Sequence, residues 1–384
     1  MIIDKKVGNV EKTSPRKFLI IGNKTSSVVN FRGDLLCDIK KKGYEIVAVV
    51  PENDCKDFFE KNGIRVRLAK LNKNSLSVSG TINWYKNLKK IITEERPDKV
   101  LSFTIKPVIF GSVAAKKSGV KDIYSLICGL GMLFCSNKPK IKALRVVGGK
   151  LYKHALKYNT KVIFQNTDDI SEFTQKGYVE KNKCELVNGS GVNLERFSRN
   201  EIPQDKVSFL MVSRVLKEKG VAEYFEAAEI AKGKYPNASF VYIGSVDKNK
   251  NAIDLVNLKP YIDAGIIDYV PETSEVAKYV AGCSVFVLPT YYREGIPRTL
   301  LEAAAMGRPI ITTNTPGCKE TVIEGKNGLF VKTRDAKDLA KKMIWMIEHK
   351  DNLQKMGDES YKICLDKFTI DKVNADMMRI MGVE

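Results

Sequence analysis

The chain has 384 residues, of which 43% are hydrophobic, and this length and composition favour a globular protein of two domains. No run of about 18 apolar residues is present, so no membrane-spanning helix is expected. The two histidines, His154 and His349, leave little material for a zinc site or a histidine-based triad. The eight cysteines form no C-x-x-C pair, and in a chain of this size they favour reduced thiols in a cytosol over disulfides.

The net charge of +19 is concentrated in the first half of the chain. Residues 1–198 contain 37 lysines and arginines against 19 acidic residues, whereas residues 199–384 contain 27 against 26. Such an asymmetry indicates an anionic partner that faces the first half, and nucleic acid and an anionic membrane leaflet are the two obvious candidates. The alternative is that proteins of the source are generally rich in lysine, so that the excess is only solvated surface charge. The second half of the chain, however, does not show this excess.

Short apolar segments alternate with segments of helical periodicity from residue 17 onward. The strands expected in the first half are Lys17–Gly22, Glu45–Val50, Ile64–Leu68, Lys99–Phe103, Ile123–Leu126 and Val162–Phe164. The helices expected there are Phe31–Lys42, Asp54–Asn62, Thr81–Glu95, Val108–Lys117 and Lys140–Lys157. This alternation predicts right-handed crossovers and a parallel sheet with helices on both faces.

The alternation pauses from about Val187 to Asp205, where the sequence is polar and rich in turn formers, and then begins again. The strands expected in the second half are Val207–Val212, Ser239–Gly244, Ile266–Tyr269, Val285–Leu288 and Pro309–Thr312. The helices expected there are Val221–Lys234, Ser274–Ala281, Arg298–Met306, Ala336–Glu348 and two within Asp351–Met381. The predicted fold class is therefore α/β, with two tandem Rossmann-like domains.

The pattern divides the chain into five parts. An N-terminal extension covers residues 1–16, and it lacks the apolar core of a signal peptide. The two Rossmann-like domains cover residues 17–190 and 207–365 and are joined by a linker over 191–206, and a C-terminal helix within 366–384 is expected to pack back toward the first domain. Ligands of open α/β sheets bind at the carboxyl ends of the strands. Two facing domains would therefore share one cleft, and closure about the linker would exclude water from it.

Two glutamates follow the expected strand Val285–Leu288. Glu294 lies on the loop before a helix N-terminus, and Glu302 lies eight residues later inside that helix. The first turn of a helix offers free N–H groups to anionic or hydroxyl-rich ligands, and carboxylates accept hydrogen bonds from sugar hydroxyls. This segment, EGIPRTLLEAAAMGRPI, resembles the E-x7-E motif of retaining GT-B glycosyltransferases, especially glycosyltransferase family 4. In that family the first glutamate contacts the donor sugar and the second contacts the donor ribose.

The resemblance also implies a site for the donor diphosphate. The segment SRVLKEKG, from residue 213, follows an expected strand and looks like the family's phosphate-binding R-x4-K element. Arg214 and Lys219 would neutralise the charge that grows on the leaving nucleoside diphosphate. With Glu294 they are the predicted catalytic residues. The predicted donor-binding residues are Gly244, Gly295, Ile296, Pro297, Thr299 and Glu302.

In the first half, candidate residues follow four expected strands, and after the fourth, Val162–Phe164, the segment 164–168 (FQNTD) is a further candidate for the cleft. Segment 22–33 (GNKTSSVVNFRG) is predicted as a loop, which in family members lies against the diphosphate and the acceptor. The segments TIKP, from residue 104, and CGLG, from residue 128, resemble elements of a subgroup that acts in bacterial surface-polysaccharide and glycan assembly. No histidine precedes His154, so no histidine base can act there. The predicted acceptor-side residues are Asn30, Arg32, Thr104, Lys106, Gly129, Gly131 and Asn166.

The resemblance implies transfer of a hexose or N-acetylhexosamine from a UDP-sugar, with retention of configuration and with no metal or other cofactor. The leaving phosphate oxygen would accept the proton of the incoming hydroxyl, in place of the two-carboxylate scheme of glycoside hydrolases. The acceptor would be a polyprenyl-diphosphate-linked sugar, bound by domain 17–190 at the inner face of the cell membrane. The basic first half would dock there from the cytoplasm, with the apolar, basic stretch 132–147 in the interface.

Three alternatives stay open. A family 4 enzyme could act on a soluble or different lipid acceptor. A UDP-N-acetylglucosamine 2-epimerase shares the GT-B fold, but its catalytic carboxylates and histidines cannot be placed in this sequence. A non-enzymatic nucleic-acid binder would account for the basic composition, but no RNA-binding or helix-turn-helix pattern is visible.

Overall fold

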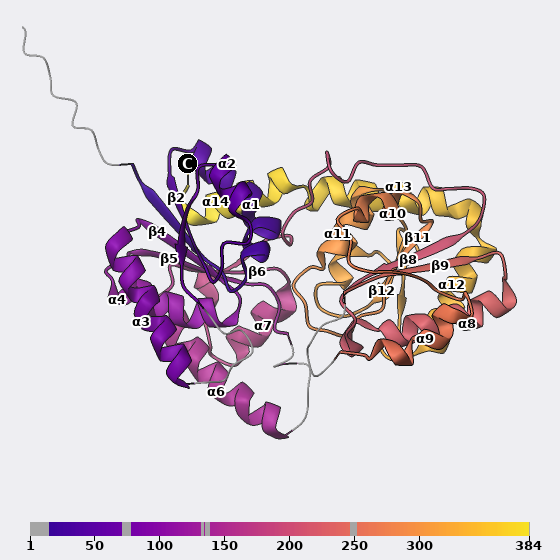
Figure 1. The fold of residues 1–384 in the computed structure, drawn as a ribbon, viewed down its shortest axis with the longest axis horizontal. Helices are drawn as coiled ribbons and strands as arrows, with labels where there is room; N and C mark the ends of the chain where they lie inside the picture. The colour runs from indigo at the N-terminus through magenta and orange to yellow at the C-terminus, as the bar shows by residue number, and fades with distance from the viewer. Residues whose placement is uncertain (1–14, 71–77, 132–133, 135–138, 246–251, 384) are drawn as a thin grey trace, which may run out of the picture.

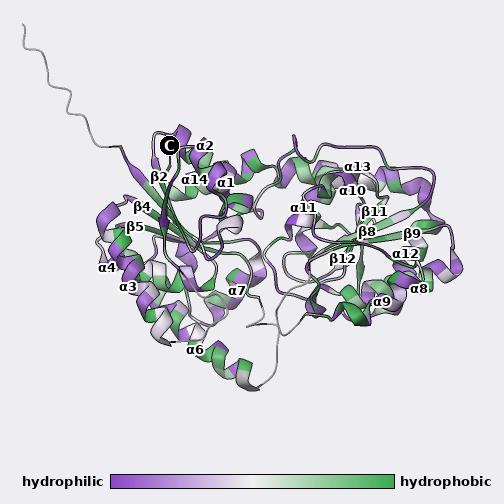
Figure 2. Cartoon of the chain, viewed as in Figure 1, coloured by the Kyte–Doolittle hydropathy of each residue, from purple (hydrophilic) through white to green (hydrophobic). Residues whose placement is uncertain are grey.

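The computed structural model of the protein describes residues 15–70, 78–131, 134, 139–245 and 252–383. Two α/β units stand next to each other, each built on one sheet (Figure 1). The predicted N-terminal extension therefore lies almost entirely outside the described residues. In both units the hydrophobic residues are concentrated on the strands and the inner sides of the helices (Figure 2).

The N-terminal unit is built on a seven-stranded sheet with the order β3-β2-β1-β4-β5-β6-β7, in which all pairings are parallel. Its strands are β1 (Lys17–Ile21), β2 (Glu45–Val50), β3 (Arg65–Leu68), β4 (Lys99–Phe103), β5 (Asp122–Ile127), β6 (Lys161–Phe164) and β7 (Cys184–Leu186). Its helices are α1 (Thr25–Lys41), α2 (Lys56–Lys61), α3 (Val78–Glu95), α4 (Ser112–Lys117), α6 (Pro139–Leu156) and α7 (Thr167–Gln175). Alternate residues of β1 enter different cores, Phe18 beneath α1 and Leu19 beneath α3, because helices cover both faces.

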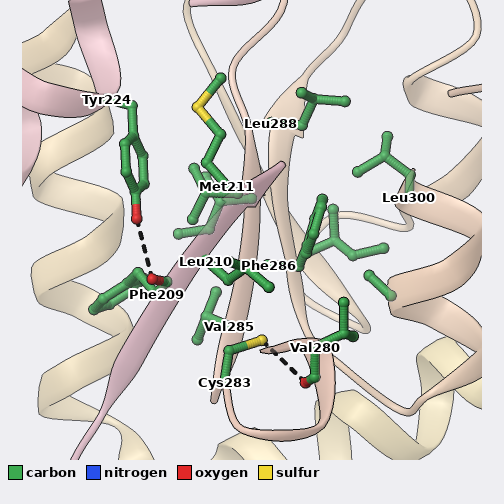
Figure 3. Packing of buried hydrophobic residues seen from close by; sticks show 14 of the residues in the cluster. Phe209, Leu210, Met211, Tyr224, Val280, Cys283, Val285, Phe286, Leu288 and Leu300 are labelled. Carbon is green, nitrogen blue, oxygen red and sulfur yellow. Dashed lines mark hydrogen bonds between the residues drawn. The ribbon is translucent and has the colours of Figure 1, made fainter. Parts of the chain in front are cut away.

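The C-terminal unit is built on a six-stranded parallel sheet with the order β10-β9-β8-β11-β12-β13. Its strands are β8 (Ser208–Val212), β9 (Ser239–Ile243), β10 (Asp268–Val270), β11 (Val285–Leu288), β12 (Ile310–Thr313) and β13 (Gly328–Val331). Its helices are α8 (Val221–Lys234), α9 (Lys259–Asp263), α10 (Val276–Ala281), α11 (Arg298–Ala305), α12 (Ala336–Glu348) and α13 (Leu353–Lys367). Figure 3 shows Phe209 and Phe286 of adjacent strands in its core, where the Tyr224 hydroxyl donates to Phe209 O at 3.1 Å.

The last helix, α14 (Ile370–Met381), packs on the N-terminal unit. Asn374 Nδ2 donates to Asp38 Oδ2 of α1 at 2.8 Å, and the buried Tyr124 hydroxyl of β5 donates to Met381 O at 2.9 Å. The chain thus passes between the units twice, after β7 and after α13 (Figure 1). The two crossings lie side by side, because residue 192 exchanges main-chain hydrogen bonds with residues 368 and 370.

The α/β class and the two tandem parallel sheets expected from the sequence are confirmed. The loop predicted over residues 22–33 is wrong, because α1 begins at Thr25 and includes Asn30 and Arg32. The polar residues 25–27 resemble a turn, but Val28 and Leu35 are fully buried on one face of the helix. The short edge strands β7 and β13 were not predicted, since edge strands of three and four residues carry little hydrophobic periodicity.

Candidate active site

The loop between β11 and α11, residues 289–297, forms the centre of the site. Glu294 lies on this loop, and its carboxylate forms an ion pair with Lys219 Nζ from the turn between β8 and α8. Both side chains are less than one fifth exposed. Gly220 makes the approach possible, because it has a positive φ of 76° and a Cβ there would lie 2.4 Å from Pro289 O. The structure therefore brings together two of the three predicted catalytic residues.

Arg214 and Gly244 lie at the carboxyl ends of the adjacent strands β8 and β9. Gly244 packs directly on the β8 end, where a Cβ would lie 2.4 Å from Ser213 O. The Tyr242 hydroxyl donates to the same carbonyl at 3.1 Å. Both predicted residues are thus placed at the strand ends from which Lys219 also projects.

Glu302 lies on α11 and is 8% exposed. Arg298 Nε lies 2.9 Å from its carboxylate, one helical turn earlier. Burial raises the pKa of Glu302 above its ordinary value, and the charge of Arg298 opposes that rise. Arg298 also reaches the N-terminal unit, where it donates to Asn30 O and lies 5.5 Å from the centre of the Phe31 ring. Asn30 therefore contacts Arg298 only through its main-chain carbonyl oxygen, and its side chain is exposed.

The other predicted donor-binding residues lie in the turn between Glu294 and Glu302. Gly295 and Ile296 are buried, Pro297 is the N-cap of α11, and Thr299 is in its first turn. A Cβ at Gly295 would lie 1.8 Å from Gln165 Oε1 of the N-terminal unit. The glycine therefore allows the two units to touch at this loop.

Two predicted acceptor-side glycines hold the Glu294 loop from the N-terminal unit. Gly129 has a φ of 93°, and a Cβ there would lie 2.3 Å from the Glu294 carbonyl carbon. Gly131 N donates to Arg293 O at 2.9 Å, and Gly295 N donates back to Cys128 O at 3.2 Å. The turn after β5 and the loop after β11 are thus in direct main-chain contact.

The segment after β6 holds the same loop from a second side. Asn166 Nδ2 donates to Glu294 O at 3.4 Å, and Gln165 Oε1 accepts from Ile296 N at 3.3 Å. Gln165 and Asn166 are 5% and 1% exposed, so their positions are fixed by packing. The backbone of Glu294 is therefore positioned by the unit that does not contain it.

Arg293 links the loop to α7 through two carboxylates. Its guanidinium lies 3.1 Å from Asp169 Oδ1 and pairs with Glu172. Asp169 is fully buried, and its amide donates to the Asn166 side chain at the start of α7. Burial raises the pKa of Asp169 from 3.8 to about 6, while Asn166 and Arg293 oppose the rise.

Arg32 and Thr104 both contact the thiol of Cys128, whose carbonyl oxygen accepts from Gly295 N, and Lys106 follows Thr104 by two residues. Arg32 is 2% exposed and its guanidinium contacts the Cys128 thiol. Thr104 follows β4 with a φ of 70°, which is unusual for a β-branched residue. Lys106 is half-buried, and burial lowers its pKa.

Two family models match the chain. One, described as glycosyl transferases group 1, matches residues 193–363, and the other, described as glycosyl transferase 4-like, matches residues 19–166. The two matched ranges follow the two α/β units. The chain is a glycosyltransferase with the GT-B fold.

Two relatives of this glycosyltransferase are named for transfer to sugars linked to undecaprenyl diphosphate. It is 28% identical over 336 residues to the N,N'-diacetylbacillosaminyl-diphospho-undecaprenol alpha-1,3-N-acetylgalactosaminyltransferase of Campylobacter jejuni, covering 84% of this chain and 87% of that one. It is 25% identical over 281 residues to the UDP-Gal:alpha-D-GlcNAc-diphosphoundecaprenol alpha-1,3-galactosyltransferase of Escherichia coli, covering 69% and 70%. The crystal structure of a glycosyltransferase from Rickettsia africae has the same fold, with a TM-score of 0.77 at 19% identity over 96% of this chain and 98% of that one.

Sequence reasoning missed the residues of the glycosyltransferase that fix the loop rather than face the ligand. Arg293 stands directly before Glu294, and Arg298 stands four residues before Glu302, a spacing that places both side chains on one helix face. That spacing could have revealed the Arg298–Glu302 pair. Segment 164–168 is a predicted cleft segment, but nothing local in the sequence indicates that Gln165 and Asp169 contact a loop more than 120 residues away.

Proposed function

We propose that this glycosyltransferase moves a hexose or N-acetylhexosamine from a UDP-sugar to a polyprenyl-diphosphate-linked sugar, with retention of anomeric configuration. The observation that carries the proposal is the Lys219–Glu294 ion pair at the strand ends between the two units. The names of the Campylobacter jejuni and Escherichia coli relatives support the choice of donor and acceptor. The intact E-x7-E pattern supports the retaining course.

Glu294 and Glu302 bind the donor, and Arg214 and Lys219 stabilise its leaving group. The carboxylate of Glu294 accepts hydrogen bonds from hydroxyls of the donor sugar, while Glu302 does the same for the ribose. Lys219 already lies against Glu294, so a bound donor places its diphosphate beside a fixed ammonium group. Fixed charges of this kind stabilise a leaving diphosphate without solvent reorganisation.

The chemistry needs no protein nucleophile and no metal ion in this scheme. The acceptor hydroxyl attacks the anomeric carbon from the face that the diphosphate leaves, and an oxygen of the leaving phosphate accepts the proton of that hydroxyl. Arg214, Lys219 and the first turn of α11 supply the positive charge that a metal would otherwise provide. Glu294 then acts by holding the sugar in position rather than by forming a covalent bond.

A membrane-facing surface for the acceptor is offered by α6. The apolar side chains of Leu144, Val146 and Val147 are 41%, 59% and 54% exposed, and Lys142 and Lys150 are exposed beside them. The helix carries no acidic residue, and Figure 2 shows it at the lower edge of the N-terminal unit. Exposed apolar groups on a basic helix suit the interface of an anionic leaflet. No helix in the described segments is both long and apolar enough to cross a bilayer.

A UDP-release assay with and without undecaprenyl-diphosphate-linked sugars tests the function. We expect release from one UDP-sugar to depend on the lipid acceptor and to be abolished in Glu294→Gln. Release that is equally fast with a soluble sugar would favour the alternative acceptor class. Conversion of the UDP-sugar to its epimer, with no transfer, would contradict the proposal.

Vesicle co-sedimentation tests the membrane contact. We expect the protein to bind anionic vesicles at low salt, and the double variant Val146→Gln and Val147→Gln to bind less. Equal binding of the wild type to neutral and anionic vesicles would contradict the electrostatic part of the proposal.

A further inference from the structure

Arg32 of α1 is a buried cation that forms no ion pair with any acidic residue in the part of the chain that the structure describes. It is 2% exposed, and its Nε and Nη1 have no hydrogen-bond partner among the described residues. Burial lowers the pKa of Arg32, and the second cation nearby, Arg298, acts in the same direction. A charge that is removed from water without a partner destabilises a folded protein substantially.

Arg308 shows how the same side chain is accommodated in a structural role. It is fully buried in the C-terminal unit, and its two terminal nitrogens donate to the carbonyl oxygens of Asn200, Glu201 and Ala281 at 3.1–3.3 Å. Within the described ranges, by contrast, no carbonyl oxygen accepts a hydrogen bond from Nε or Nη1 of Arg32. Packing alone therefore does not explain why Arg32 is buried.

The neighbouring thiol does not supply the missing charge. The Arg32 guanidinium contacts Cys128 at the end of β5. Burial raises the pKa of Cys128 above its ordinary value, although Arg32 opposes the rise. The thiol is thus uncharged near neutral pH.

Thr104 at the end of β4 adds a second unsatisfied group at the same place. Its main chain hydrogen-bonds the Cys128 thiol, and its Oγ1 is buried with no hydrogen-bond partner among the residues that the structure describes. Its left-handed backbone, with a φ of 70°, costs energy in a β-branched residue. Strain and unpaired polar groups that persist together are typical of ligand sites.

We propose that Arg32 and Thr104 bind a phosphate group of a substrate diphosphate, which supplies the counter-charge that the protein lacks. The inference rests on the proposed function, whose two substrates each carry a diphosphate. A guanidinium and a hydroxyl are donors that suit phosphate oxygens. The site adjoins the reaction centre, because Cys128 O accepts a hydrogen bond from Gly295 N beside Glu294.

Arg32→Met tests the proposal through opposite effects on stability and on binding. Removal of an unpaired buried cation should raise the Tm of the ligand-free protein, whereas a structural arginine would lower it when replaced. The affinity for the diphosphate substrate should fall about 10- to 100-fold, as expected for lost charge-assisted hydrogen bonds. The exposed Arg379 provides a matched control, since Arg379→Met should change neither quantity.

Two binding measurements identify the source of the phosphate. A weaker affinity for UDP in Arg32→Met assigns the site to the donor, and a raised KM for the lipid-diphosphate acceptor with unchanged UDP affinity assigns it to the acceptor. Values of both within twofold of wild type would overturn the proposal. Thr104→Val carries the same test if Arg32→Met does not fold.

Stabilisation by inorganic pyrophosphate separates this proposal from the proposed function. We expect pyrophosphate to raise the Tm of the wild type and of Arg379→Met, and to raise that of Arg32→Met clearly less, because only the Arg214 and Lys219 contacts remain in that variant. Failure of the wild type to transfer sugar, with this pattern intact, would refute the function and leave the phosphate site standing. An equal pyrophosphate shift in all three proteins would refute the site.

Discussion

Replacement of Asp169 by asparagine should remove a pH-dependent term from the stability of the protein. Asp169 is fully buried at the start of α7 and pairs with Arg293 of the C-terminal unit. Burial raises its pKa from 3.8 to about 6. Because the folded-state pKa lies above the unfolded one, the stabilising contribution is complete below about pH 4 and is lost as the pH rises through about 6.

The size of the effect follows from the shift. A rise from 3.8 to about 6 corresponds to about 3 kcal/mol of stability lost between low and neutral pH. A change of 1 kcal/mol moves Tm by roughly 2–4 °C in a domain of this size. Asparagine keeps the shape of the side chain but cannot ionise, so the variant lacks this loss.

Thermal unfolding of the wild type and Asp169→Asn from about pH 4 to pH 8 measures the effect. The Tm of the variant minus that of the wild type should rise with pH and level off above about pH 6.5, whatever its value at low pH. The other titrating groups are common to both proteins, so the difference reports Asp169 together with its interaction with Glu172 and Arg293. Asp376→Asn, a substitution of the same type at an exposed site on α14, is measured alongside as a control. A difference that is flat or falls with pH would refute the reasoning.

Three substitutions test the site itself. Lys219→Met should lower the rate of transfer roughly 100- to 1,000-fold at unchanged circular dichroism, by loss of a fixed charge at the diphosphate, and a loss under tenfold would contradict that role. Glu302→Gln should reduce the preference for UDP over 2′-deoxy-UDP, measured by calorimetry, whereas an unchanged preference would exclude a ribose contact. Gly129→Ala should abolish transfer but leave UDP affinity within a few-fold of wild type, because the added Cβ would meet the backbone of Glu294 at 2.3 Å. Full activity in that variant would show that the contact between the units is dispensable.

The fold and the donor half of the site follow from local sequence, whereas the contacts between the units do not. Alternating apolar and helical segments predict both sheets, and Glu294 and Lys219 lie on the loops that follow strands β11 and β8, where ligands of parallel sheets bind. The start of α1 was misjudged because residues 25–27 are polar and resemble a turn, although Thr25 and Val28 are both buried in the helix. A helix N-terminus that lacks a capping side chain gives no local sequence indication of where it begins.

The position of segment 164–168 after a strand predicts that it lies at the cleft, but the contacts that position the loop could not be predicted because they form across the interface. Gln165 and Asp169 contact residues 296 and 293 only after the units come together, and no periodicity records such an encounter. The burial of Arg32 could not be predicted from the sequence either, since an arginine on a helix is usually exposed. Its two unpaired nitrogens are a property of the packed structure.

The stereochemistry of the product tests the central claim most directly. Proton NMR of the glycolipid formed from an α-linked UDP-N-acetylhexosamine and an undecaprenyl-diphosphate-linked sugar reports the configuration of the new bond. We predict an α-linkage with the wild type and no product with Glu294→Gln. A β-linkage, or an α-linked product formed at the wild-type rate by Glu294→Gln, would contradict the account.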